Sequence, residues 1–150
     1  MVMCGIAGIL RGSFVKKDLL AQEAISISES LKSRGPDSSG YWIDSELGLS
    51  FAHRRLSIQD LSSKGNQPFV SHSGRYVIIY NGEIYNHNSL RKELSKTSQK
   101  NYKWSSNSDT ETLLACIEEW GLQLSLNKFV GMFAFALWDK RKRSLYLVRD

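Results

Sequence analysis

The chain has 150 residues, of which 41% are hydrophobic and 23% charged, a composition that excludes intrinsic disorder and collagen-like repeats and predicts one globular domain. The 20 lysines and arginines outnumber the 15 acidic residues and give a net charge of +5, but they are scattered, so we expect no nucleic-acid partner. No apolar run approaches the ~20 residues that cross a bilayer, and two cysteines are too few for a disulfide framework, so we expect a cytoplasmic protein without a membrane partner.

The first half of the chain predicts a strand, a helix and then further strands. Small and branched apolar residues from Cys4 to Leu10 indicate a buried strand. Apolar residues recur every three or four positions between Lys17 and Lys32, which is typical of one helix face, and the turn residues Arg34 to Asp37 end that helix. Short strands are expected at Gly40 to Ile43, Leu47 to His53 and Tyr76 to Tyr80.

The second half predicts two helices and a β-hairpin, which makes the fold class a layered α+β domain. One helix is expected from Asn88 to Lys96, and the capping-box spacing of Ser108 to Glu111 starts another that Gly121 ends. The hairpin is expected from two apolar runs, Met132 to Trp138 and Leu145 to Val148, with a solvated basic turn between them. Because the last strand pattern runs to the final residues, we expect a fragment of a longer chain.

Two cysteines offer different prospects for chemistry. Cys116 lies within an amphipathic helix pattern, which predicts a core residue. Cys4 beside a glycine also fits a small buried residue, unless other polar groups surround a substrate there. The three histidines have no metal-ligand spacing with either cysteine, which excludes a zinc site, and no phosphate-binding glycine motif indicates a nucleotide site in this chain.

Several polar residues follow apolar strand patterns, and each has two interpretations. Asn81-Gly82 is either a hairpin turn or an oxyanion hole, in which a side-chain amide and a glycine N–H converge on one oxygen. Arg55 is either a surface charge or a bidentate clamp for a carboxylate. Asp109 at a helix start has a strong explanation without a functional role, namely a favourable charge–dipole interaction and capping.

Taken together, six segments resemble successive motifs of the glutaminase domain of glutamine-hydrolysing asparagine synthetases, the class II glutamine amidotransferases. The resemblance runs in order over essentially the whole chain, which implies one such domain over residues 1–150. The segments are Met3 to Gly8, Arg34 to Asp37, His53 to Ile58, Asn81 to Asn86, Ser108 to Glu111 and Gly131 to Ala136.

The resemblance implies an N-terminal-nucleophile fold, a four-layer αββα sandwich with two antiparallel sheets, that is C-terminally incomplete here. It implies hydrolysis of L-glutamine to glutamate and ammonia through a thioester on Cys4. Asn81 and Gly82 match the oxyanion hole. The implied substrate-binding residues are Arg55 for the α-carboxylate, Glu83 and Asp109 for the α-ammonium, and Leu56, Ser57, Ile58 and Gln59 as the pocket wall, chiefly through backbone groups.

A zwitterionic amino acid needs a fixed cation and fixed anions, and these charged residues supply both. A free α-amino group titrates near 8 and a thiol near 8.5, so a cysteine at the chain terminus carries a matched base. In the family the cysteine directly follows the initiator methionine, whereas Met1-Val2-Met3 precede Cys4 here. We therefore expect the mature chain to begin at Cys4.

The resemblance also implies a covalently linked synthetase domain outside this chain. That domain would bind ATP and Mg²⁺ and pass ammonia to an activated acid, typically aspartate; no cofactor and no metal are expected within residues 1–150. An acceptor other than aspartate (a sugar or another carboxylic acid) stays open, as do a catalytically silent binding fragment and a homodimer.

Overall fold

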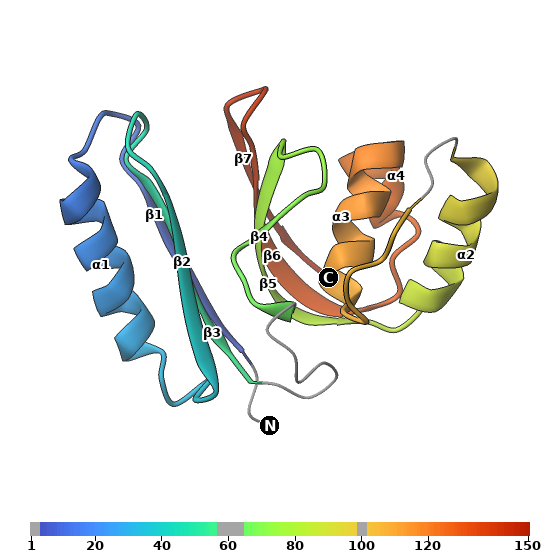
Figure 1. The fold of residues 1–150 in the computed structure, drawn as a ribbon, viewed down its shortest axis with the longest axis horizontal. Coiled ribbons are helices and arrows are strands. Elements are labelled where there is room, and N and C mark those ends of the chain that lie inside the picture. Colours follow the sequence, from blue (N-terminus) through green and yellow to red (C-terminus); the bar gives the residue numbers. More distant parts are fainter. Residues whose placement is uncertain (1–3, 57–64, 99–101) are drawn as a thin grey trace.

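Two antiparallel sheets face each other, and helices cover the outer side of each (Figure 1). The computed structural model describes residues 4–56, 65–98 and 102–150. The first sheet has the order β1 (Gly5–Leu10), β3 (Leu49–Arg55), β2 (Ser38–Asp44). The second has the order β4 (Phe69–Val70), β5 (Tyr76–Ile84), β6 (Gly131–Asp139), β7 (Ser144–Arg149).

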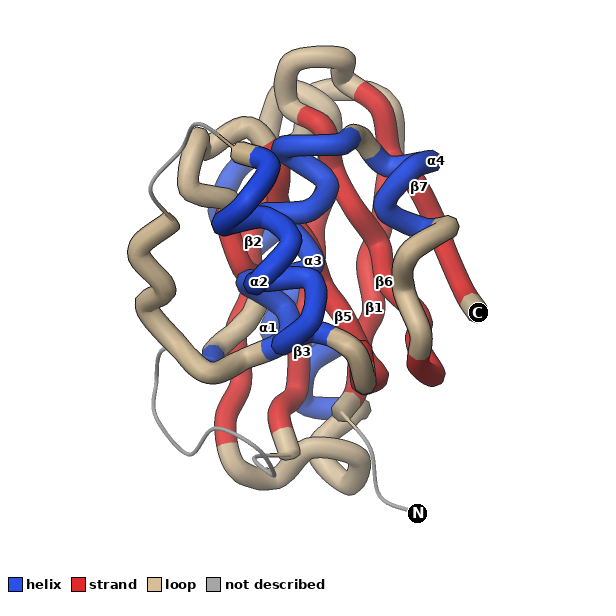
Figure 2. Tube along the Cα trace, turned by 90° about the vertical axis from the view of Figure 1, so that its right-hand side faces the viewer, coloured by secondary structure: helices blue, strands red, loops and turns tan. Residues whose placement is uncertain are grey.

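The helices lie on opposite outer faces. Helix α1 (Lys17–Ser30) covers the first sheet, whereas α2 (His87–Thr97), α3 (Asp109–Trp120) and α4 (Leu122–Leu126) cover the second (Figures 1 and 2). The layers therefore follow the order helix, sheet, sheet, helix. None of the helices in the described ranges is long and apolar enough to cross a membrane.

Strand β5 contributes to two separate cores, because successive side chains of a strand point to opposite faces of its sheet. Val77 and Ile79 belong to the core between the two sheets, together with Phe51 of β3. Tyr80 and Ile84 belong to the core between the second sheet and the helices. The same alternation continues to the end of β5, so Asn81 lies on the face of Val77 and Ile79, and Gly82 on the face of Tyr80 and Ile84.

Most predicted elements form within a few residues of the expected bounds. The predicted hairpin forms as β6 and β7, with the basic turn Lys140 to Arg143 exposed, and Cys116 is fully buried as a core residue. Strand β4 and helix α4 were not predicted, because their 2 and 5 residues are too short to show a period.

The hairpin-turn interpretation of Asn81-Gly82 is wrong. Strand β5 continues through both residues to Ile84 and pairs without a break against β6, with Gly82 opposite Phe133. The Asn-Gly preference for a turn is a local one, and a ladder with a neighbouring strand overrides it. Asn81, Gly82 and Glu83 therefore stand on a paired strand.

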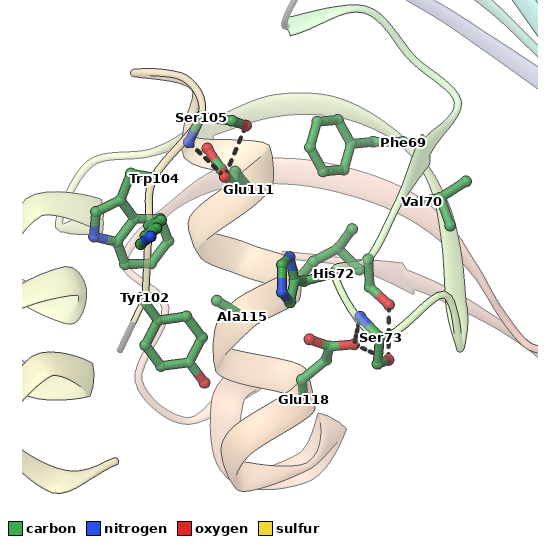
Figure 3. A pocket seen from close by; sticks show the side chains of 13 residues that line it. Phe69, Val70, His72, Ser73, Tyr102, Trp104, Ser105, Glu111, Ala115 and Glu118 are labelled. Atoms are coloured by element: carbon green, nitrogen blue, oxygen red, sulfur yellow. Dashed lines mark hydrogen bonds between the residues drawn. The ribbon is translucent and has the colours of Figure 1, made fainter. Parts of the chain in front are cut away.

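The start of α3 forms only half of the predicted capping box. Ser108 caps the helix, since its hydroxyl oxygen accepts the Thr110 N–H at 3.3 Å. Glu111 does not reach back to the Ser108 N–H, which donates to Ser106 Oγ instead at 3.2 Å. The Glu111 carboxylate accepts the N–H and hydroxyl groups of Ser105 and Ser106, each at 2.9 Å (Figure 3 shows the Ser105 pair), and so fastens the loop that leads into the helix.

Candidate active site

Cys4 and Arg55 come from adjacent ends of the first sheet. Strands β1 and β3 are antiparallel, so the start of β1 lies beside the end of β3 (Figure 1, lower end of the sheet). Ile6 and Phe51 pack into the core between the two sheets, and Cys4 and Arg55 occupy the same alternating face of their strands. Both side chains therefore point toward the second sheet.

Asn81 meets them from the second sheet. It follows Val77 and Ile79 on β5 at intervals of two, so its side chain continues the face that packs against the first sheet. The C-terminal part of β5 lies at the same lower end of the fold as the start of β1 (Figure 1). The two facing sheets thus bring a thiol, a guanidinium and a side-chain amide to one end of the space between them.

The thiol of Cys4 is half-buried and contacts backbone. The Leu56 N–H donates to Cys4 Sγ at 3.4 Å, and Sγ lies 3.8 Å from the Leu56 carbonyl oxygen. These contacts place the thiol at the point where the chain leaves β3. The other thiol differs, because burial raises the pKa of Cys116 to about 12 and keeps it protonated.

Arg54 and Arg55 are neighbours in sequence but point to opposite sides of the first sheet. Arg54 faces α1, where it donates to the Ser28 carbonyl at 3.1 Å and to the Glu29 carboxylate at 2.8 Å. Arg55 faces the second sheet, is buried at 8% exposure, and donates from Nη1 to Asn66 Oδ1 at 2.9 Å. The resemblance selected Arg55 as the carboxylate-binding residue, and it is the one of the two that lies on the Cys4 face.

The turn Arg34 to Asp37 packs directly against the backbone of these arginines. A Cβ on Gly35 would lie 2.4 Å from the Arg54 carbonyl, so only glycine permits this approach. The Asp37 N–H donates to the Arg55 carbonyl oxygen at 3.1 Å. The turn therefore fixes the end of β3, from which Arg55 projects.

The edge of β5 that faces away from β6 carries alternate backbone N–H groups. The Tyr80 N–H donates to Gln67 Oε1 at 2.6 Å, and the Ile84 N–H donates to Asp109 Oδ2 at 2.8 Å. By alternation, the Gly82 N–H leaves the strand on this same edge, between the two anchored positions. Gln67 and Asp109 thereby hold the strand on both sides of Gly82.

Gly82 is needed for close approach to β6. Its φ of +153° is one that L side chains rarely adopt, and a Cβ there would lie 2.3 Å from the Met132 carbonyl oxygen. Any side chain would push the two strands apart. The geometry at this position therefore depends on glycine.

Asp109 reaches the end of β5 from the helix side. Asp109 is buried at 6% exposure, and its Oδ2 accepts the Tyr80 hydroxyl at 2.5 Å as well as the Ile84 N–H. Burial and the negative charge of Asp109 raise the pKa of the Tyr80 phenol, which keeps it a donor. Both donors bind Oδ2, which leaves Oδ1 without a hydrogen-bond donor among the described residues.

His53 lies one alternation before Arg55 on β3 and is buried between the sheets at 1% exposure. Burial lowers its pKa to about 4; the charge of Arg55 acts in the same direction, and a hydrogen bond with the Tyr80 backbone opposes it. Its Nε2 has no hydrogen-bond partner among the described residues. The imidazole is therefore neutral at physiological pH.

This neutral histidine makes stability depend on pH. In the unfolded chain His53 titrates near 6.5, so the unfolded state binds more protons between pH 6.5 and 4 and unfolding becomes easier as the pH falls through that range. Denaturant unfolding at pH 7 and pH 4.5 should show a loss about 2 kcal/mol larger in the wild type than in His53→Asn. An equal loss of unfolding free energy in the wild type and in His53→Asn would contradict His53 as the origin of the pH dependence.

Of the remaining predicted site residues, Glu83 lies on β5 and three others lie outside the residues that the structure describes. Glu83 lies on the Asn81 face of β5 and is exposed. Ser57, Ile58 and Gln59, predicted to line the pocket with Leu56, lie outside the described residues. Within residues 4–56, 65–98 and 102–150, no group of three or more His, Cys, Asp or Glu side chains is placed to hold a metal ion.

Asn66 and Gln67 were not predicted as site residues. Both precede β4, and each binds a site element through its side-chain oxygen, Asn66 to Arg55 and Gln67 to the Tyr80 backbone. A single amide side chain in a connecting segment belongs to no hydrophobic period and no spaced motif, so the sequence gives no indication of its function. The roles of Asn66 and Gln67 become visible only from their contacts with distant residues.

A cavity of about 690 Å³ lies elsewhere, between β4, residues 102–105 and α3 (Figure 3). Its walls include Phe69, Tyr102, Trp104 and Glu118, and none of Cys4, Arg55 and Asn81 lines it. Glu118 there accepts hydrogen bonds from the backbone N–H and hydroxyl of Ser73 (Figure 3). This cavity is separate from the candidate active site.

A family model and the sequences of known proteins place the chain in the same family. Residues 3–150 match a family described as a glutamine amidotransferase domain. The chain is 40% identical over 149 residues to glutamine-hydrolysing asparagine synthetase 2 of Bacillus subtilis, and 38% identical over 150 residues to glutamine-hydrolysing asparagine synthetase B of Escherichia coli. Each alignment covers 99% of this chain but only 19% and 25% of the respective relatives. The chain thus spans about a fifth to a quarter of their length.

Solved structures give the same fold. The chain is similar to a glutamine phosphoribosylpyrophosphate amidotransferase from B. subtilis, with a TM-score of 0.70 over 99% of this chain and 37% of that chain. The sequence identity is 17%, so the similarity concerns the fold alone. It confirms the predicted α+β sandwich of the N-terminal-nucleophile class, with two antiparallel sheets between helical layers.

Proposed function

This chain belongs to the glutamine amidotransferase domain family, and we propose that it hydrolyses the side-chain amide of L-glutamine to glutamate and ammonia. The proposal rests on two placements: Cys4 and Arg55 stand at adjacent ends of the first sheet, and Asn81 lies on the face of β5 that packs against that sheet. A nucleophile, a fixed cation and an amide donor in one place are what hydrolysis of a zwitterionic amide requires.

Substrate recognition divides between the two ends of the amino acid. Arg55 binds the α-carboxylate, because a planar guanidinium matches a carboxylate with two parallel hydrogen bonds. Asp109 Oδ1 and the Glu83 carboxylate bind the α-ammonium. Leu56, whose backbone N–H donates to Cys4 Sγ, contributes to the pocket wall between them.

Catalysis proceeds through a covalent intermediate on Cys4. The sulfur attacks the amide carbon, and the oxygen that gains negative charge accepts hydrogen bonds from the Asn81 side chain and the Gly82 N–H. The C–N bond then breaks, and the nitrogen leaves as ammonia with the proton taken from the thiol. Water attacks the resulting thioester, releases glutamate and restores the thiol.

The base in this scheme is the α-amino group of Cys4 in a mature chain that begins at that residue. An α-amine has a pKa near 8, close to that of a thiol, so it exchanges the proton efficiently at neutral pH. His53 does not supply this function, because its pKa near 4 makes it a poor proton acceptor. N-terminal sequencing of the protein from its own host tests the processing; an intact Met1-Val2-Met3 would contradict it.

In the whole protein we propose that the ammonia passes to a covalently linked synthetase domain. The two relatives reported above are named glutamine-hydrolysing asparagine synthetases, which supports asparagine as the product and aspartate as the acceptor. The ATP and Mg²⁺ that this reaction would use are what the family resemblance implies. That chemistry lies outside residues 1–150, and we expect it in the cytoplasm. An assay of the full chain with ATP, Mg²⁺, glutamine and either aspartate or another acid distinguishes the acceptors.

The glutaminase step is tested on the full chain with two neighbouring arginines. Arg55→Met should raise the KM for L-glutamine by roughly 10- to 100-fold, because it removes a charge-assisted pair with the α-carboxylate. Arg54→Met is the matched control: it removes an arginine that faces α1, so it should lower stability and leave KM unchanged. Steady-state release of glutamate measures both. Equal KM values for the two variants would contradict the assignment of Arg55.

A further inference from the structure

Arg91 of α2 lies against the segment that leads into α3. Its Nε donates to Thr112 Oγ1 at 2.7 Å, and its Nη2 donates to the carbonyl oxygens of Ser106 at 3.1 Å and Ser108 at 2.9 Å. The guanidinium also stacks on the ring of Trp104, 4.2 Å from its centre. One side chain thus contacts four residues on both sides of Asp109 in the sequence.

The segment that Arg91 holds has little else to define it. Residues 102–108 contain no helix or strand, so their backbone depends on side-chain contacts. Glu111 fastens Ser105 and Ser106 from one side, and Arg91 binds the Ser106 and Ser108 carbonyls from the other. Ser108 is the cap of α3 and Asp109 follows it directly. The position of the Asp109 backbone therefore depends on this arginine.

Asp109 is held at its other end by β5. The Tyr80 hydroxyl and the Ile84 N–H fix Oδ2, which sets where the carboxylate stands relative to the strand that carries Asn81 and Gly82. The position of the Asp109 carboxylate thus depends on two sets of contacts. Strand β5 binds its Oδ2, and Arg91 binds the backbone that leads into Asp109. A carboxylate that recognises a substrate ammonium has to be held in place before the substrate arrives.

We propose that Arg91 is a positioning residue that holds Asp109 for recognition of the substrate α-ammonium; this rests on the proposed glutaminase function. Arginine is suited to this role, because its planar fork of five N–H donors serves several acceptors at once while its face stacks on an aromatic ring. A lysine ammonium cannot occupy all of these positions together. Arg91 itself does not touch the substrate.

The test uses the full chain and two substrates that differ only at the α-carbon. L-Glutamine carries the ammonium, and glutaramate keeps the carboxylate and the amide but has hydrogen in its place. Arg91→Ala should lower kcat/KM for L-glutamine roughly tenfold, mainly through KM, and leave kcat/KM for glutaramate nearly unchanged. Arg91→Lys should recover part of the loss. Asp109→Asn should remove the preference for glutamine, and adding Arg91→Ala to it should have little further effect.

Arg75→Ala is the matched control. Arg75 also stacks on an aromatic ring, Tyr76 at 4.7 Å, and donates to both oxygens of Asp139, but it lies at the opposite end of β5 from Asn81. Its loss should lower the melting temperature and leave the ratio of the two substrates unchanged.

The outcomes separate the two proposals. A wild-type chain that begins at Cys4 and hydrolyses neither substrate overturns the glutaminase function and the role of Arg91 with it. An active wild type in which folded Arg91→Ala loses activity on both substrates equally overturns the role of Arg91 alone. If Arg91→Ala does not fold, Arg91→Lys decides: an unchanged substrate ratio overturns the proposal, and a reduced one supports it.

Discussion

Cys4→Ala is expected to lower the rate of glutamine hydrolysis by roughly 10³-fold or more while the protein stays folded. The substitution removes the only atom that forms the covalent intermediate in the proposed reaction. Cys4 is half-buried, and among the described residues its sulfur makes hydrogen bonds with the Leu56 backbone alone, so its loss should change stability little. Glutamate release and thermal unfolding measure the two effects separately.

Cys116→Ala is the control for this experiment. Cys116 is fully buried in α3, and its thiol pKa of about 12 makes it unreactive. Its replacement should lower the free energy of unfolding by about 1 kcal/mol and keep the glutaminase rate. A Cys4→Ala protein that hydrolyses glutamine at the wild-type rate would contradict the nucleophile assignment.

Gly82→Ala is expected to lower kcat by roughly 10²- to 10³-fold, the effect of losing one oxyanion donor. An added Cβ would lie 2.3 Å from the Met132 carbonyl oxygen and 2.5 Å from Phe133 Cα, so β5 has to move away from β6. That movement displaces the Gly82 N–H from the reacting oxygen. Single-turnover kinetics with L-glutamine measure the change in the acylation step.

Two further variants make the Gly82 result interpretable. Gly74→Ala also adds a Cβ at positive φ, +74°, but no atom lies within 4 Å, so it should cost only about 1 kcal/mol of backbone strain and keep kcat. Asn81→Ala removes the other proposed donor without forcing the strands apart and should lower kcat by a similar factor. Wild-type kcat in Asn81→Ala would contradict the oxyanion hole at this position.

Elements with a clear period could be predicted from the sequence. The apolar stripe that follows Ser108 located α3, and alternating runs around the basic turn located β6 and β7. The Asn-Gly turn was wrong because a dipeptide reports local preference, whereas pairing of β5 with β6 depends on residues about 50 positions later in the chain. The two-sheet sandwich was expected from the family resemblance, whereas the order of strands within each sheet was not predicted.

The candidate site was predicted mainly by resemblance, and the structure adds the physical reasons. Sequence alone cannot distinguish Arg54 from Arg55, since the two differ only in which side of the first sheet they face. Asp109 was explained by its charge at a helix start and by capping; it does lie in the first turn of α3, but Ser108 is the cap, and the Asp109 carboxylate also binds Tyr80 and Ile84 across the fold. Gln67 and Arg91 had no signal, because each acts through backbone groups of residues distant in the chain.

The most direct measurement is an intact mass of the full chain before and after treatment with a diazoketone analogue of L-glutamine, which alkylates a nucleophile placed at the amide carbon. The untreated mass shows whether the chain begins at Cys4. We expect a single adduct that Cys4→Ala abolishes and Cys116→Ala retains. No adduct on a chain that begins at Cys4, or an adduct that persists in Cys4→Ala, would contradict a glutaminase site built on Cys4.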